Sequence, residues 1–106
     1  MRNRKRKVKP IKPDEIVELK KVVIPTEVIE TVNILLAQKF CNGYATILQE
    51  DIVDALIVRT GWTSDFIFDN NYLDFEDIYR EAGWKVVYDK PGFNEDYDKK
   101  FHFSKG

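Results

Sequence analysis

All fourteen aromatic residues of this 106-residue chain lie at or after Phe40. Aromatic side chains bury large apolar areas, so a small domain depends on them for its hydrophobic core. The core is therefore expected in the later part of the sequence. The length is that of one domain around one core. No apolar run approaches the roughly 18 residues that a membrane-spanning helix needs, so we expect no membrane partner.

The charged residues divide the chain into two parts of opposite sign. Residues 1–12 hold seven cations and no acid, whereas the remaining 94 residues hold ten cations and all eighteen acids. Such asymmetry is typical of a charged arm attached to a domain. Because the basic part has few apolar residues to bury, we expect it to be mobile until a polyanion orders it. We therefore predict a flexible basic arm over residues 1–13, a lead-in segment over 14–24 and a folded domain over 25–106.

Three segments of the domain have helical periodicity. The first, over 25–41, carries apolar residues at helical spacing and is followed by an Asn-Gly pair that suits a left-handed stop. The second begins at Gln49, has acids in its first turn and ends at Gly61. The third, over 74–82, can be capped by Asp74. Its predicted apolar stripe consists of Phe75, Ile78, Tyr79 and Ala82.

Short alternating segments predict the strands. Residues 84–88 and 100–104 alternate apolar and polar side chains and are expected to pair as a two-stranded hairpin. Residues 89–98 between them are rich in turn formers and too numerous for a tight turn, which predicts a protruding tip. Residues 44–48 form a further candidate strand.

The order helix, short strand, helix, helix and hairpin resembles that of winged-helix domains, which add a β wing to a helix-turn-helix. The resemblance covers residues 25–104 and rests on the order of the elements. It implies an α+β, winged-helix-like fold with three helices, a short strand and a C-terminal two-stranded β-hairpin. This architecture is associated with DNA binding.

The tail of the sequence carries a second resemblance. The segment Tyr79-Arg-Glu-Ala-Gly-Trp-Lys-Val-Val-Tyr-Asp-Lys-Pro-Gly-Phe-Asn-Glu95, with Phe-His-Phe103 after it, resembles small uncharacterised proteins of tailed bacteriophages. It implies a viral source and a bacterial cytoplasm, and it transfers no catalytic residue. The single cysteine, which favours a reducing compartment, and the absence of an apolar stretch behind the basic start agree with a cytoplasmic protein.

The basic arm is the most informative functional feature. Clustered cations neutralise phosphates, and the counterions they release make binding strongly dependent on salt. The alternatives are an acidic protein or the chain's own acidic domain as the partner, or a solubilising tail with no partner. The residues predicted to contact nucleic acid, in the arm and on the hairpin, are Arg2, Arg4, Lys5, Arg6, Lys7, Lys9, Lys12, Lys90, Lys99 and Lys100.

The third predicted helix argues against reading of a duplex through the major groove. Recognition helices use Arg, Lys, Asn or Gln on base edges, whereas this helix has one cation, Arg80. Its carboxylates could instead imitate phosphate and bind a basic groove of a host protein, or simply be a solvated face. These carboxylates belong to Asp74, Glu76, Asp77 and Glu81. We therefore predict a non-enzymatic nucleic-acid-binding module, with a modulator of a host protein as the alternative.

Few residues are suited to catalysis or metal binding. We expect Cys41 to be a small buried residue and His102 to face outward between Phe101 and Phe103, so that the pair does not react. One cysteine and one histidine fall short of a zinc site. The acids of the loop 89–98 lack the spacing of a calcium loop. We expect no metal and no cofactor.

The aromatic residues are interpreted mainly as core. Side chains on the hairpin could stack on bases, but their alternation places them toward the helices. The aromatic residues assigned to the core are Trp62, Phe66, Phe68, Phe75, Trp84, Tyr88, Phe101 and Phe103. Phe93 and Tyr97, near the tip, are the better candidates for exposed contacts.

Overall fold

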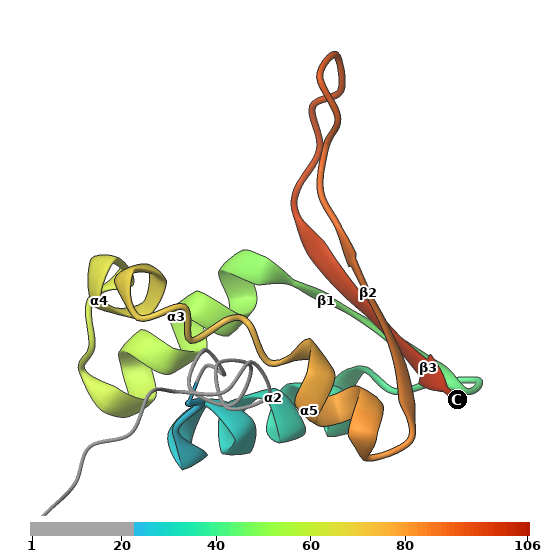
Figure 1. Cartoon of the computed structure of the whole chain (residues 1–106), viewed down its shortest axis with the longest axis horizontal. Coiled ribbons are helices and arrows are strands. Elements are labelled where there is room, and N and C mark those ends of the chain that lie inside the picture. Colours follow the sequence, from blue (N-terminus) through green and yellow to red (C-terminus); the bar gives the residue numbers. More distant parts are fainter. Residues whose placement is uncertain (1–22) are drawn as a thin grey trace, which may run out of the picture.

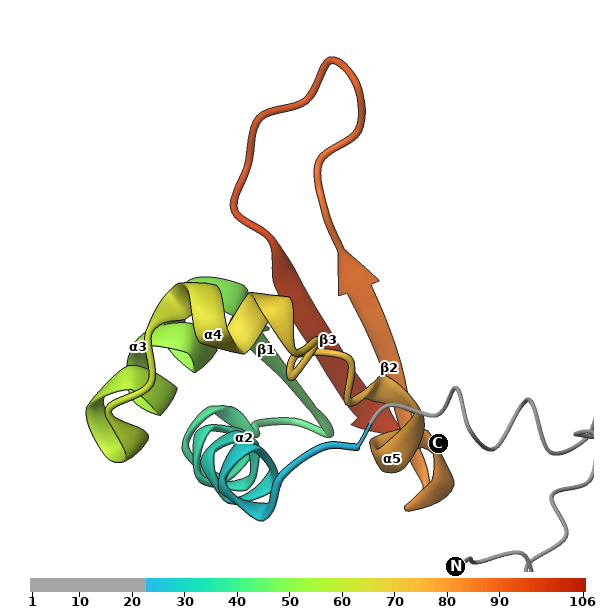
Figure 2. The same cartoon turned by 60° about the vertical axis from the view of Figure 1, so that its left-hand side comes forward.

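The computed structural model describes residues 23–106. Within them, the helices lie on one side of an antiparallel sheet, and a long hairpin loop stands away from this body (Figure 1 and Figure 2). The fold is α+β, as predicted. The predicted basic arm and all of the lead-in segment before Val23 lie outside the described residues.

Four helices and three strands make up the described part of the chain. In order, they are α2 (Thr26–Lys39), β1 (Tyr44–Leu48), α3 (Gln49–Thr60), α4 (Ser64–Asp69), α5 (Glu76–Glu81), β2 (Trp84–Asp89) and β3 (Lys100–Lys105). The first two predicted helices and the three predicted strands are confirmed to within two residues at each end. The third predicted helix is shorter than expected. Asp74 does not cap it, because the residue at the cap position is Phe75.

The Asn-Gly pair after α2 has a different role from the one predicted. The helix already ends at Lys39, and Phe40 is extended. Asn42 (φ 54°) and Gly43 (φ 91°) instead form a two-residue turn, closed by hydrogen bonds between Cys41 and Tyr44. Consecutive positive φ angles suit the turns that reverse a twisted chain most tightly. Cys41 lies beside this turn and is exposed, so the prediction that it is buried is wrong.

A short helix follows α3 and buries one side chain. Gly61 has a left-handed backbone (φ 82°) and ends α3 as predicted. The Thr63 hydroxyl accepts a hydrogen bond from the backbone N–H of Phe66 and caps α4. Ile67 is buried, whereas Phe66 and Phe68 are 42% and 47% exposed. Successive helical residues are about 100° apart, so the two neighbours of an inward residue point sideways. The assignment of these two phenylalanines to the core is therefore wrong.

The sheet has three strands in the order β1-β3-β2, rather than the two of the predicted hairpin. β1 pairs with β3 over its whole length, with Ile47 opposite Phe101, and β2 pairs with the other edge of β3, with Val86 opposite Phe103. A two-stranded ribbon is marginal alone. The added strand brings Ala45 and Ile47 to the face that already carries the phenylalanines, so all three strands bury one common face.

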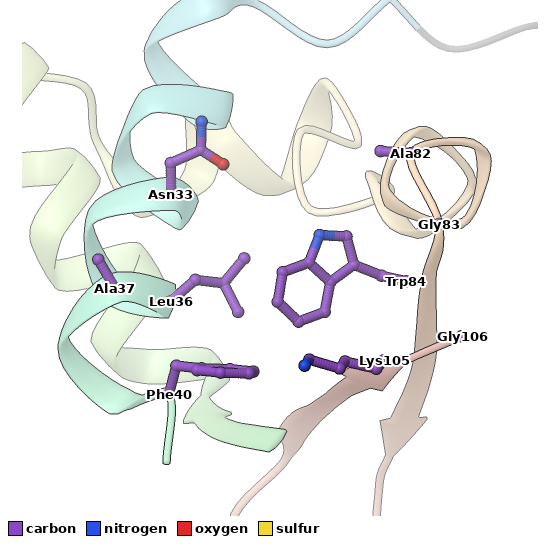
Figure 3. Close-up of a pocket in the computed structure, with 9 residues that line it drawn as sticks. All are labelled: Asn33, Leu36, Ala37, Phe40, Ala82, Gly83, Trp84, Lys105 and Gly106. Carbon is purple, nitrogen blue, oxygen red and sulfur yellow. The ribbon is translucent and has the colours of Figure 1, made fainter. Parts of the chain in front are cut away.

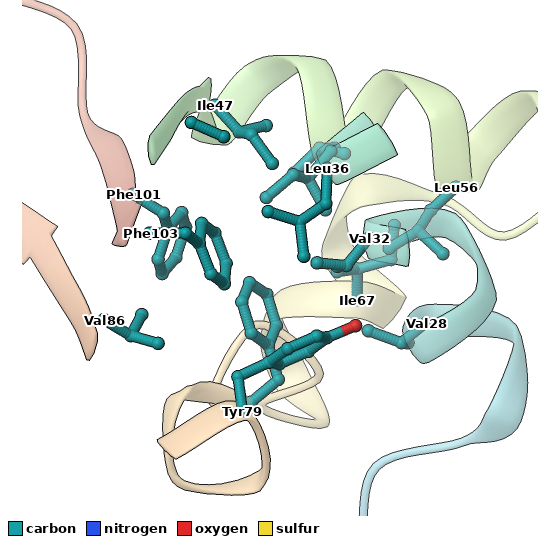
Figure 4. Packing of buried hydrophobic residues seen from close by; sticks show 14 residues of the cluster. Val28, Val32, Leu36, Ile47, Leu56, Ile67, Tyr79, Val86, Phe101 and Phe103 are labelled. Carbon is teal, nitrogen blue, oxygen red and sulfur yellow. The ribbon is translucent and has the colours of Figure 1, made fainter. Parts of the chain in front are cut away.

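The core lies between this face and the helices (Figure 4). Phe75 is fully buried, and its ring centroid is 4.9 Å from that of Phe101, 5.8 Å from Tyr79 and 6.3 Å from Phe103. Two residues of the predicted stripe of the third helix, Phe75 and Tyr79, are thus in the core. The other two are not. Ile78 is 41% exposed and Ala82 is also exposed. A single six-residue helix can turn only a narrow stripe toward the core.

Tyr79 fastens α5 to α2. Its hydroxyl lies 2.7 Å from Asn33 Oδ1 and 3.2 Å from the carbonyl oxygen of Ile29, and it donates to these acceptors. The side chain is 5% exposed. Burial raises the pKa of Tyr79 to about 12, because the phenolate would be poorly solvated there.

The Tyr79→Phe variant is expected to lower the free energy of unfolding by about 1 kcal/mol at neutral pH, through loss of this hydrogen bond. Because the pKa of Tyr79 is higher in the folded than in the unfolded chain, its contribution is complete below pH 10 and is lost as the pH rises toward 12. Urea unfolding between pH 10 and 12 should show a smaller decline in the free energy of unfolding for the variant than for the natural chain. Identical declines for the two proteins would contradict the raised pKa of Tyr79 in the folded chain.

Candidate nucleic-acid and partner surfaces

The three hairpin lysines that were predicted to contact nucleic acid lie among acidic residues. Lys90 and Lys99 are exposed at the two ends of the loop, and the Lys100 ammonium lies 5.4 Å from the centroid of the Tyr97 ring. Four acids accompany these three lysines, namely Asp89, Glu95, Asp96 and Asp98. The segment 89–100 therefore has no excess of positive charge with which to extend a basic surface. The predicted phosphate contacts of the arm lie outside the described residues.

In the structure, α4 follows α3 across a short turn. The predicted third helix corresponds to α5, which comes later in the chain. A turn of three residues, 61–63, separates α3 from α4. α4 has two aspartates and no cation. In α5 the Arg80 guanidinium pairs with the Asp77 carboxylate at 2.9 Å, which uses the one cation of that helix. Neither helix thus presents a free cation to base edges or phosphates.

The fold exposes the four acids of the proposed protein-binding surface to different degrees. Asp74, Asp77 and Glu81 are exposed, and Asp77 is paired with Arg80. Glu76 is only partly exposed, and its Oε1 atom is buried with no hydrogen-bond partner among the described residues. Glu76 is therefore less accessible to a partner than the other three acids.

Glu76 is one of the residues that line a cavity of about 270 Å³ at the base of the hairpin. The cavity is also lined by Tyr88 of β2, whose hydroxyl donates to Gln49 Oε1 at 2.6 Å. Burial raises the pKa of Glu76, and the neighbouring Asp74 carboxylate adds to the increase. Burial, followed by the charge of Glu76, also raises the pKa of Tyr88. Nothing in the spacing of these residues along the chain indicated that they would meet.

We expect the Glu76→Gln variant to be more stable than the natural chain at pH 7, by up to about 1 kcal/mol given the partial exposure of this side chain. The pKa of Glu76 is raised in the folded chain, so its contribution is complete below the ordinary value of 4.5 and is lost as the pH rises. The gain should therefore vanish in acid. Urea unfolding at several pH values tests this, with the exposed Glu81→Gln as the control. A gain that persists in acid would contradict the burial of this charge.

A second hollow, a groove of about 690 Å³, lies between α2, the turn from α5 to β2, and the end of β3. The Phe40 and Trp84 rings enter it from opposite walls (Figure 3) and meet edge to face, with their centroids 5.8 Å apart. Leu36 and the Lys105 side chain also line it. Phe40 and Trp84 are 44 positions apart, so helical and strand spacing did not reveal this groove.

The outer face of the sheet carries a chain of hydrogen bonds around His102. Its Nδ1 atom lies 3.0 Å from Thr46 Oγ1, and its Nε2 atom lies 3.1 Å from Asp89 Oδ2. The Tyr97 hydroxyl donates to Asp89 Oδ1 and so ties the hairpin loop to the sheet. This bond from Tyr97, followed by the one with His102, lowers the pKa of Asp89. His102 faces outward as predicted, between the buried Phe101 and Phe103.

This arrangement of hydroxyl, imidazole and carboxylate is solvated rather than enclosed. The His102 and Asp89 side chains are 42% and 38% exposed. Catalytic triads depend on a buried carboxylate that orients and stabilises the imidazolium. We therefore assign the chain of hydrogen bonds to the anchoring of the hairpin. Among residues 23–106, no three His, Cys, Asp or Glu side chains converge in a way that could hold a metal ion.

None of the helices in the described part of the chain is both long and apolar enough to cross a membrane. The sequence matches no protein-family model. No curated protein and no solved structure is significantly similar to the chain.

Proposed function

We propose that the chain is a non-enzymatic, winged-helix-like binding module that contacts nucleic-acid phosphates through its basic N-terminal segment. The division of charge carries this proposal. Residues 1–12 hold seven cations and no acid, whereas residues 23–106 hold eight cations and fifteen acids. Affinity for a polyanion must then come from the N-terminal segment. Contacts of this kind position a protein on nucleic acid without reading its sequence.

Three features of the body support the winged-helix-like assignment. The expected elements occur in the expected order, with α4 as an additional helix between α3 and α5. A short turn connects α3 to α4, and the loop between β2 and β3 projects like a wing. The acids of α4 and α5 argue against insertion of either helix into a major groove. We propose that the body presents the basic segment to nucleic acid, and that neither α4 nor α5 enters the major groove as a recognition helix. The resemblance of its tail to phage proteins favours action in a bacterial cytoplasm.

The test compares the full chain with a variant in which every cation of residues 1–12 is replaced by glutamine. We expect about a 100-fold or greater loss of affinity for a short DNA duplex and for single strands, because most phosphate contacts disappear. A matched variant with glutamine at Lys85, Lys90, Lys99 and Lys100 should change affinity far less. No binding by the natural chain, or equal binding by the first variant, would refute the proposal.

A second candidate is a modulator that binds a basic protein of the host. The groove favours it, because the exposed Glu81 directly precedes Ala82 and Gly83, which line an apolar hollow together with Phe40 and Trp84. Protein interfaces combine an apolar anchor with a polar rim of complementary charge. The occupant would be a basic surface that inserts one apolar side chain.

Charge reversal tests this second candidate. The full chain should retain a stoichiometric protein from nuclease-treated bacterial lysate. Binding should be lost in Glu81→Lys together with Trp84→Ala, and kept in Asp54→Lys, which reverses an exposed acid on α3. Equal loss in both variants would show attraction by overall charge and would count against a specific groove.

A further inference from the structure

The groove between α2 and the start of β2 has the size of a small-molecule site. Its volume of about 690 Å³ lies within the roughly 300–1,000 Å³ that such sites usually have. Phe40 is 39% exposed, and Ala82 on the opposite wall is exposed as well, so solvent reaches the apolar lining. The apolar residues of this lining are Leu36, Ala37, Phe40, Ala82 and Trp84. They suit the apolar body of a ligand.

The polar side chains of the groove offer hydrogen-bond donors. Asn33 Oδ1 already accepts from the Tyr79 hydroxyl at 2.7 Å, which leaves the Asn33 amide nitrogen to donate elsewhere. The indole nitrogen of Trp84 lies on the side of its ring toward Asn33, and the Lys105 ammonium points into the groove (Figure 3). An indole N–H and an ammonium can only donate. Within residues 23–106, none of these three nitrogens has a hydrogen-bond partner and none is buried, so a ligand in the groove can reach them.

Lys105 carries the only charged side chain among the nine residues that line the groove. Within the described part of the chain it forms no ion pair, either with an acidic side chain or with the carboxylate of the neighbouring Gly106. The body as a whole is anionic, since residues 23–106 hold eight cations and fifteen acids. A positive charge at this groove therefore indicates a ligand with a negatively charged group. One ammonium balances one negative charge, so a carboxylate fits better than a phosphate, which carries about two.

We propose that this groove binds a small carboxylic acid with an aromatic or aliphatic body. The carboxylate accepts a hydrogen bond from the Lys105 ammonium, and the body packs against Leu36, Phe40 and Trp84. Charge-assisted hydrogen bonds of this type are about twice as strong as those between neutral groups. The N–H groups of Asn33 and Trp84 remain for a further oxygen of the ligand, such as that of a carbonyl or a hydroxyl group.

This inference rests on neither proposed function. The proposed contacts with nucleic-acid phosphates use residues 1–12, whereas the small acid is recognised by residues of α2, β2 and β3. The acid occupies the hollow into which the second candidate function inserts an apolar side chain of a partner, so the groove holds one or the other at a time. Failure of the small acid to bind therefore leaves both proposed functions standing.

The experiment follows the indole N–H signals of the ¹⁵N-labelled full chain during titration with phenylbutyrate at pH 7. We expect a saturable shift of the Trp84 signal, which the Trp84→Phe variant identifies by its loss. The Trp62 signal should stay in place, because this ring packs against Phe66 and Tyr72 and does not line the groove. The neutral analogue phenylbutyramide has the same body without the charge and should bind about tenfold more weakly or less tightly still.

Two lysine variants test the role of the ammonium. Lys105→Met keeps an apolar stem but removes the charge, so affinity for phenylbutyrate should fall about tenfold. The matched Lys85→Met variant removes an exposed cation from the neighbouring strand β2 that does not line the groove, and it should bind nearly as well as the natural chain. Both lysines are exposed, so neither variant should disturb the fold. The proposal is overturned by any of four results: no saturable shift of the Trp84 signal, equal shifts of the two indole signals, equal weakening by the two lysine variants, or equal binding of the amide.

Discussion

Replacement of Phe75 by alanine should lower the free energy of unfolding by about 3–5 kcal/mol. The side chain is fully buried, and the rings of Tyr79, Phe101 and Phe103 surround it. These rings belong to two elements, α5 and β3, whose backbones are fixed by the fold, so they cannot easily collapse into the space that the phenyl group leaves. Domains of this size are stable by only about 5–15 kcal/mol, so the loss takes much of the total. Urea unfolding followed by tryptophan fluorescence measures it.

The matched control is the same substitution at Phe93, which lies in the hairpin loop and is 99% exposed. It should change the free energy of unfolding by less than about 0.5 kcal/mol, because the Phe93 ring buries almost no surface in the folded chain. A similar loss of stability at both positions would contradict the expectation that Phe75 stabilises the fold through its burial in the core. An unchanged denaturant slope would show that each variant still unfolds cooperatively.

Binding of the natural chain to duplex DNA should weaken about a thousandfold or more between roughly 50 and 200 mM salt. Each cation that neutralises a phosphate contributes about −0.9 to the slope of log affinity against log salt. If all seven cations of residues 1–12 make contacts, the slope is therefore about −6. Fluorescence anisotropy of labelled duplex over a series of salt concentrations gives this value.

The hairpin lysines test whether the wing takes part. Glutamine at Lys90, Lys99 and Lys100 should leave the slope almost unchanged, because the acids of the same loop offset these cations. A slope that shrinks by about three would show that all three contact phosphate. A slope near zero for the natural chain would rule out phosphate contacts as the source of affinity.

Local signals in the sequence predicted most helix and strand boundaries. Gly61 ends α3 because a residue without a side chain tolerates left-handed backbone at little cost. The alternation around His102 gave the orientation of β3 correctly, since neighbouring strand residues point to opposite faces. Such signals act over a few residues, so they do not depend on which distant segments meet in the folded chain.

Assignments that depended on the choice of face were less successful. Phe66 and Phe68 are as apolar as Phe75, yet only Phe75 is buried, because Ile67 takes the inward position of α4. Cys41 is exposed because the chain reverses beside it. The third helix was predicted too long, because the backbone leaves the α-helical conformation at Phe75 and Ala82.

The sequence alone determined the order of all described elements except α4 and the separation of a cationic segment from an anionic body, because backbone preferences and charges belong to individual residues. Only the tertiary structure decided that β1 joins the hairpin in one sheet, that Phe40 and Trp84 share a groove, and that Glu76 and Tyr88 line one cavity. Each of these depends on residues distant in the chain meeting in space. Their positions are set by how the whole core packs, which no short segment encodes.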